Sequence, residues 1–357
     1  MASNGQDHDN NNTHPKTNRS DEHDWRDLPA TPSYLASLFR QYNLAPEAWQ
    51  PAQKIAGMIP TGRDWLRFAD ILMAGMGTIF LLAGILFFFA FNWDDLSKWQ
   101  RFGIVEGAVV ISTILAFVLN INRWSGRLAL GSATILMGVA LAVISQEYQT
   151  GANSYRLFQV WLMLITGWVL ISRWNIMYLI WMILLNITVA LYWEQIIGRD
   201  WQNLNLLLLV VNAGFVFVWE TLAHNTAIKF MKEGRWFLYV VMVIALIHAT
   251  TLMGDYVLET RVIENPNLLI PTAYFGLLGL TLFFYIVIHQ DLLMLTFSAL
   301  STLVIGVIWS GRWLWDLIGE TGGSLGYFSL MTLITVSLTA LLVIQLRALN
   351  NRWERQS

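Results

Sequence analysis

Long apolar runs are the sequence feature that most constrains the fold of this chain. They begin at about residue 71, continue almost to the C-terminus, and are separated by short polar segments. A helix that crosses the roughly 30 Å hydrocarbon core of a bilayer needs about 20 residues, with about 17 as a lower bound. Because the runs do not alternate with polar residues, they predict an all-α, polytopic membrane protein and not a barrel. The ten expected spans are residues 71–91, 102–119, 128–144, 157–171, 176–193, 204–222, 236–252, 268–288, 292–309 and 327–346.

Composition agrees with a polypeptide that lipid, not water, solvates. Of the 357 residues 55% are apolar and only 13% are charged, whereas an average soluble domain has roughly 25% charged residues. The net charge of -2 offers no basic field for a nucleic-acid backbone, so we expect no nucleic-acid partner. The chain has no cysteine, which excludes disulfides, thiolate metal sites and cysteine nucleophiles.

The N-terminal residues differ sharply from the rest in composition. Residues 1–30 are polar and predict a disordered tail. Residues 31–68 predict a short cytoplasmic helical segment, with one helix starting at Thr31-Pro32 and a second running from Pro46 to Pro60. Residues 69–347 form the expected transmembrane bundle, and 348–357 form a C-terminal tail. The first span lies too far from the N-terminus for a cleaved signal peptide, so we expect an uncleaved anchor.

Basic residues are distributed unequally between the two ends of the spans, and this bias predicts orientation. One side carries twelve of them, at positions 54, 63, 67, 123, 127, 173, 229, 232, 235, 347, 352 and 355. The other side carries six, at positions 98, 101, 156, 199, 261 and 312. The bias and the even number of spans predict that both termini are cytoplasmic.

Two ionisable residues inside spans are candidates for chemistry. Glu106 lies about one turn from the outer end of the second span, between glycines at GxxxG spacing, and His248 lies at a similar depth in the seventh. A carboxyl and an imidazole at one depth could pass protons or bind a cation. The alternative is a hydrogen-bonded carboxyl near the interface and a packed histidine. Asn186 and Asn212, both mid-span, favour helix-to-helix hydrogen bonds over binding of a solute.

Two polar and aromatic segments on the expected outer face form a candidate binding site. Their residues are Asn92, Trp93, Asp94 and Asp95, and then Gln146, Glu147, Tyr148, Gln149, Thr150 and Asn153. Carboxylates, amides and a hydroxyl there could bind a cation, a sugar or a peptide. The alternative is structural: the two aspartates cap the next helix, and Thr150, Gly151 and Asn153 form a turn. We expect no catalytic set, cofactor or metal site, since the tail histidines are irregularly spaced and no phosphate-loop or zinc-protease motif occurs.

The same segments carry a resemblance to a known family. The residues in question are Arg63 to Phe68, Gly84 to Leu96, Gln146 to Asn153, Leu157, Phe158 and Trp161. Over about residues 30–195 the chain resembles a family of predicted bacterial membrane proteins whose function is unknown. The resemblance implies a bacterial inner-membrane location and a multi-span helical fold, but no activity. Relatives often have a second glutamine in place of Glu147, so here a charge replaces an amide.

Three functions remain open at this point. The first is a non-enzymatic envelope accessory, scaffold or regulatory protein that uses the polar outer face, with the lipid bilayer, an envelope protein or a second copy as partner. The second is an ion-coupled or small-solute transporter that uses Glu106 and His248. The third is a membrane enzyme that acts on lipid-linked substrates, in which Asp94, Asp95 and Glu147 converge with Asp255.

Overall fold

The chain is helical throughout the part that our computed structural model describes. Those residues are 32–43, 45–56, 58–92, 95–148, 153–198, 200–225, 234–258, 268–318 and 323–356, and they contain no strand. Ten of their helices are long and apolar enough to cross a membrane, one for each expected span. The prediction of a polytopic all-α membrane protein is therefore confirmed. The expected disordered tail, residues 1–30, lies outside the described residues.

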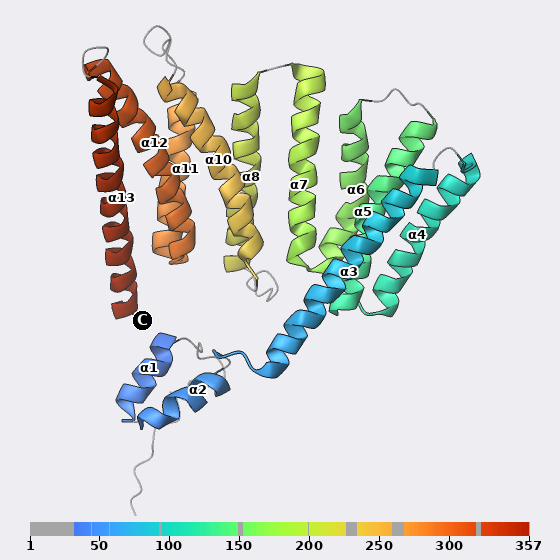
Figure 1. Cartoon of the computed structure of the whole chain (residues 1–357), viewed down its shortest axis with the longest axis horizontal. Coiled ribbons are helices and arrows are strands. Elements are labelled where there is room, and N and C mark those ends of the chain that lie inside the picture. The colour runs from blue at the N-terminus through green and yellow to red at the C-terminus, as the bar shows by residue number, and fades with distance from the viewer. Residues whose placement is uncertain are drawn as a thin grey trace, which may run out of the picture. The chain divides into compact units, whose positions relative to one another are not determined.

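The helices of Figure 1 extend beyond most of the apolar runs. Their bounds are α1 Pro32–Gln41, η2 Pro46–Ala48, α2 Trp49–Ile55, α3 Gly62–Asn92, α4 Lys98–Val118, α5 Trp124–Glu147, α6 Ser154–Ser172, α7 Asn175–Tyr192, η3 Trp193–Ile197, α8 Trp201–Asn225, α10 Trp236–Leu258, α11 Leu269–Phe283, η5 Phe284–Ile288, α12 Leu292–Ile318 and α13 Gly323–Gln356. The helix α13 continues through residues 348–356, where we expected a tail. Basic residues near its C-terminus favour this extension because they complement the helix dipole.

Contacts divide the chain into two compact units, Met1–Asp70 and Ile71–Ser357. In the first unit α1 begins at Pro32, as the sequence predicts, and its Phe39 ring lies edge-on to Trp49 of α2, with 4.9 Å between ring centroids. The second helix ends at Ile55, earlier than the expected Pro60.

In the second unit, consecutive spans pack side by side from α4 to α8, and close approach depends on a glycine of α5. A Cβ atom on Gly138 would lie 2.5 Å from Cζ2 of Trp161 on α6. The bare glycine lets this indole lie against α5, where its Nε1 donates a 2.8 Å hydrogen bond to the backbone oxygen of Thr134. Gly138 therefore sets the spacing of α5 and α6.

An aromatic cluster joins α7, α8 and α10, and a pair of amides joins α7 to α8. Tyr178 of α7, Trp219 of α8 and Phe237 of α10 are buried against one another, with Trp219 and Phe237 centroids 5.0 Å apart. Nearby, Nδ2 of Asn212 donates to Oδ1 of Asn186 at 2.6 Å, and the reciprocal bond is 3.1 Å. The prediction that these amides join neighbouring helices is confirmed.

Candidate functional site

The second outer-face segment joins two helices. An ion pair of 2.8 Å links Glu147, at the end of α5, to Arg101 near the start of α4. The Tyr148 ring stacks on that of Phe102 with 5.9 Å between centroids, and the Lys98 ammonium lies 4.0 Å from the centroid of the Tyr148 ring. Glu147 and Tyr148 thus hold α4 against α5, and Gln146 beside them is exposed.

The rest of the outer-face set is divided between exposed and undescribed positions. Asp95 is exposed and does not cap α4; the cap is Ser97, whose backbone N and Oγ both donate to Oε1 of Gln100. A serine followed three residues later by glutamine is a capping box, which explains why no aspartate is needed there. Asn153 is the N-cap residue of α6. The outer-face candidates outside the described residues are Trp93, Asp94, Gln149, Thr150 and the side chain of Asn92.

The two ionisable residues inside spans are not brought together. Glu106 is exposed on α4, whereas the Nδ1 atom of His248 on α10 lies 2.8 Å from Oδ1 of Asn205 on α8. Figure 1 shows α4 and α10 well separated, with α6 and α7 between them. For the same reason Asp255 on α10 does not converge with Asp95 and Glu147.

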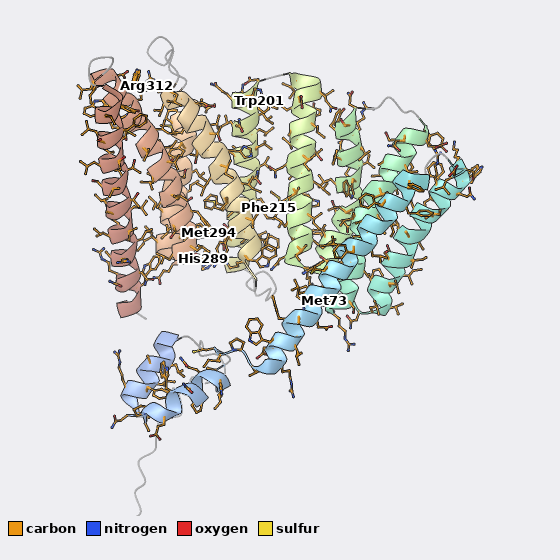
Figure 2. All side chains as sticks on the ribbon, viewed as in Figure 1. Met73, Trp201, Phe215, His289, Met294 and Arg312 are labelled. Carbon is orange, nitrogen blue, oxygen red and sulfur yellow. The ribbon has the colours of Figure 1, made fainter. Side chains whose placement is uncertain are left out.

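A different group of polar side chains converges at the opposite end of the spans, where α8 and η5 end and α10 and α12 begin. This group, the Glu220 cluster, consists of Glu220, Arg235, Tyr239, Tyr285, His289 and Asp291. In Figure 2 His289 lies at this end, and Arg312 marks the other. The Glu220 side chain is only 1% exposed, and that of Asp291 is 10% exposed.

Arg235 is shared between the two carboxylates. Its Nη2 atom donates to Oε1 of Glu220 and lies 3.6 Å from Oδ2 of Asp291. Tyr285 donates to the same oxygen of Glu220 at 3.4 Å, and Tyr239 donates to Oδ2 of Asp291 at 3.1 Å. The Arg235 guanidinium and the two carboxylates therefore join α8, α10, η5 and the start of α12.

The α12 helix gives Asp291 additional support. Its Oδ1 atom accepts hydrogen bonds from the backbone N–H groups of Leu293 and Met294, at 3.1 and 3.2 Å. This is the arrangement of a helix N-cap, where the unpaired N–H groups and the helix dipole favour a negative charge. Asp291 therefore shares Arg235 but does not depend on it alone.

On the far side of Glu220 two buried atoms face each other without a hydrogen bond. Oε2 of Glu220 and Nε2 of His289 are 3.6 Å apart, and neither has a hydrogen-bond partner among the described residues. The ring of His224 lies 5.5 Å from that of His289, centroid to centroid. A proton on either facing atom would convert the 3.6 Å contact into a hydrogen bond after a small movement.

Burial and the neighbouring charges together set the pKa values of His289 and Arg235. Burial lowers the pKa of His289 below its usual value, assisted by the positive charge of Arg235 and opposed by Glu220. Burial also favours the neutral form of Arg235, but the carboxylates of Glu220 and Asp291 outweigh it and raise the pKa of Arg235. Arg235 is thus a fixed positive charge, and His289 is neutral near neutral pH.

Counting these charges shows what the cluster can bind. Two ionised carboxylates face one arginine and about half a positive charge from the α12 N-terminus, so a fraction of a negative charge is left in a buried place. Such a charge is costly, and a proton or a small cation removes the cost. No group of three or more carboxylates and histidines in the described part of the chain has the geometry of a metal site. The geometry that favours a proton is the pair of facing, unbonded atoms, Oε2 of Glu220 and Nε2 of His289.

Sequence reasoning missed this cluster although a signal was present. Glu220 lies near the end of the apolar run 204–222, so the criterion that selected Glu106 applies to it equally. Its partners Arg235 and Asp291 resemble ordinary interfacial loop residues, and only the packing of α8, α10 and α12 brings them to it.

Comparison with known proteins gives a family for part of the chain. Residues 50–178 match the family model described as "Predicted membrane protein (DUF2157)". The resemblance to a family of membrane proteins of unknown function is thereby confirmed over a shorter stretch than expected. No curated protein and no solved structure matches the chain. The matched stretch extends from α2 to the start of α7, so the Glu220 cluster lies outside it.

Proposed function

We propose that this membrane protein is a non-enzymatic, proton-responsive regulator in the bacterial inner membrane, and that the Glu220 cluster is its proton site. The observation that supports the proposal is that Glu220 and Asp291, which are 1% and 10% exposed, share the single arginine Arg235. An ionisable group in a membrane-spanning helix costs free energy, and for this reason such groups usually mark functional sites.

Protonation would act on packing because the cluster joins the ends of four helical segments. A proton on Glu220 weakens its attraction to Arg235 at the start of α10. The same proton allows a hydrogen bond to His289, which follows η5. The π-helical turn of η5 holds Tyr285, and such turns are frequent at functional sites. We therefore expect proton uptake to move the ends of α10 and α12 relative to α8.

The proposed orientation places the cluster at the cytoplasmic end. The termini and Arg235 lie on the side that carries twelve basic residues, against six on the other side. The absence of cysteine allows a direct test with single-cysteine variants and an impermeant thiol reagent on intact cells. Asn153→Cys should react and Asn351→Cys should be protected; the reverse pattern would refute the orientation.

Distance measurements between spin labels test the proton response. We would place one label near the end of α8 and one near the start of α12, in the protein reconstituted in nanodiscs. In the parent protein the distance distribution should change between pH 7.5 and 5.5. With Glu220→Gln it should no longer depend on pH, whereas Glu194→Gln, at an exposed glutamate of η3, should behave like the parent. A pH-independent distance in the parent would remove the proposal.

A proton-coupled carrier is the second candidate, and the same cluster favours it over Glu106 and His248. A carrier must move protons across the membrane, whereas a regulator only binds them. Proteoliposomes that contain a pH-sensitive dye distinguish the two under an imposed proton gradient. Acidification that Glu220→Gln abolishes would favour the carrier, and its absence together with a pH-dependent spin-label distance would favour the regulator.

The proposed partners of the regulator are the bilayer and either an envelope protein or a second copy. Contact with the bilayer is supported by the ten apolar helices that are long enough to span a membrane. Crosslinking in native membranes should recover a reproducible protein partner or a homo-oligomer at both pH values or at one of them. Recovery of neither would contradict the partner assignment while leaving proton binding at Glu220 intact.

A further inference from the structure

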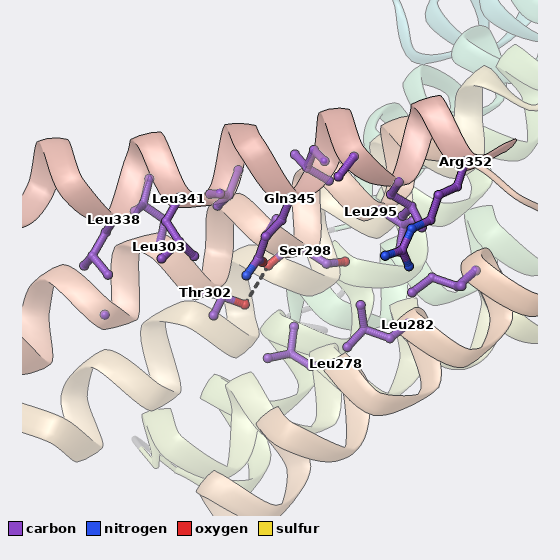
Figure 3. Close-up of a pocket in the computed structure, with 17 residues that line it drawn as sticks. Leu278, Leu282, Leu295, Ser298, Thr302, Leu303, Leu338, Leu341, Gln345 and Arg352 are labelled. Atoms are coloured by element: carbon purple, nitrogen blue, oxygen red, sulfur yellow. Dashed lines mark hydrogen bonds between the residues drawn. The ribbon is translucent and has the colours of Figure 1, made fainter. Parts of the chain in front are cut away.

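A long apolar groove runs between α11, α12 and α13 in the second unit. Its volume is about 670 Å³, within the range of sites that hold small-molecule ligands. Leucines form most of the wall, among them Leu278 of α11, Leu303 of α12 and Leu338 of α13. Figure 3 shows that Arg352 of α13 points into one end of the groove, and that Leu338 lies toward the other.

Two polar side chains in the middle of the groove, Thr302 and Ser298, are engaged within the protein, and the Gln345 amide lies beside them. Oγ1 of Thr302 donates to the backbone oxygen of Ser298 at 2.9 Å, and Oγ of Ser298 donates to that of Met294 at 3.1 Å. Arg352 differs, since no ion pair joins it to a carboxylate among the described side chains. The groove thus combines an apolar wall with one available positive charge at its end.

The depth of Arg352 in the membrane identifies what that charge meets. The apolar stretch of α13 from Tyr327 to Leu346 is about 30 Å long at 1.5 Å per residue, which equals the hydrocarbon thickness. Arg352 lies six residues further, about 9 Å along the helix, at the outer edge of the headgroup layer, and its long side chain can reach back to the headgroups. Trp353 beside it packs against the main core, so this end of α13 is held to the bundle.

We propose that the groove between α11, α12 and α13 binds one anionic glycerophospholipid, with an acyl chain along the leucines and the phosphate on the Arg352 guanidinium. The groove extends about 21 Å along α13, from Leu338 to Arg352; about 12 Å of it, up to Leu346, lies in hydrocarbon and covers most of the roughly 15 Å of one leaflet, and the rest faces the headgroup. The groove shares no lining residue with the Glu220 cluster.

Native mass spectrometry of the delipidated protein, titrated with phosphatidylglycerol or with phosphatidylcholine of the same acyl chains, tests the proposal. The parent should bind the first phosphatidylglycerol about fivefold more tightly than phosphatidylcholine, the factor expected for one arginine at the headgroups. Arg352→Gln should lose this preference. Arg347→Gln, exposed on the same helix and outside the groove, should keep it.

A second variant tests the acyl-chain part of the site. A Cβ atom on Gly306 of α12 would lie 3.6 Å from Cδ1 of Leu338, so a larger side chain there enters the groove. Gly306→Leu should weaken the binding of both lipids several-fold, whereas Arg352→Gln should weaken the binding of phosphatidylglycerol alone. Circular dichroism and monodisperse elution confirm that each variant is folded before it is titrated.

Four results would overturn the assignment. The first is equal affinity of the parent for the two lipids, and the second is that Arg347→Gln loses the preference for phosphatidylglycerol as much as Arg352→Gln does. The third is displacement of the lipid by inorganic phosphate at comparable concentration, and the fourth is a parent dimer that Gly306→Leu dissociates. The third would mean that free phosphate is the ligand, and the fourth that a second copy occupies the groove.

Discussion

Removal of the shared arginine should be one of the most destabilising single changes in this chain. Arg235→Gln leaves Glu220 and Asp291, 1% and 10% exposed, without their common counter-charge. Breaking a buried ion pair by removing one partner costs about 3 to 5 kcal/mol. The Arg235 side chain is 23% exposed, so water moderates the effect and we expect the lower end, about 3 kcal/mol.

A double variant separates the energy of the Glu220–Arg235 ion pair from the effect of replacing arginine by a smaller side chain. Glu220→Gln together with Arg235→Gln removes both charges, so the free energies of unfolding should be non-additive by about 1 to 3 kcal/mol. The deficit of Arg235→Gln should also shrink as pH falls from 7.5 to 5.5, because protonation neutralises the unpaired carboxylates.

Unfolding by SDS titration in mixed micelles, followed by circular dichroism, gives these free energies. The full set is the parent, the two single variants and the double variant, each at both pH values. A cost below about 1 kcal/mol for Arg235→Gln, or strictly additive effects in the double variant, would refute the argument that the guanidinium compensates a buried charge.

Three further predictions use the same unfolding assay. Gly138→Ala should destabilise by about 1 to 3 kcal/mol because its Cβ would overlap the α6 indole, while Gly167→Ala, with open space around it, should be neutral or better. Asn186→Leu should cost about 0.6 to 1.7 kcal/mol by removing both hydrogen bonds between the Asn186 and Asn212 amides, and the double leucine variant should recover part of this. Burial lowers the pKa of His289, so the parent should lose stability relative to His289→Gln as pH falls below the usual histidine range.

The spans could be predicted from the sequence because hydrocarbon imposes one length and one composition on every crossing helix. Even the shortest run, residues 157–171, became a full helix, Ser154–Ser172, by including polar flanking residues such as Arg156. Helix ends were less predictable, since they depend on local hydrogen bonds. The capping box of Ser97 and Gln100 was overlooked in favour of the neighbouring aspartates.

The candidate site was the least predictable part, for a physical reason. Periodicity and hydropathy report which side chains leave water, but not which helix ends meet. Glu220 and Asp291 are far apart in sequence and become neighbours only through the packing of α8, α10 and α12. Glu106 satisfied the same sequence criterion, yet it is exposed on α4. Glu147 was predicted as part of a polar binding site, and in the structure it forms an ion pair between α4 and α5.

Infrared difference spectroscopy between pH 7.5 and 5.5 tests proton binding at Glu220 most directly. The reconstituted parent should gain a protonated-carboxyl band on acidification, and this band should be missing in Glu220→Gln but present in Glu106→Gln. Identical difference spectra for the parent and Glu220→Gln would contradict the assignment of the proton site.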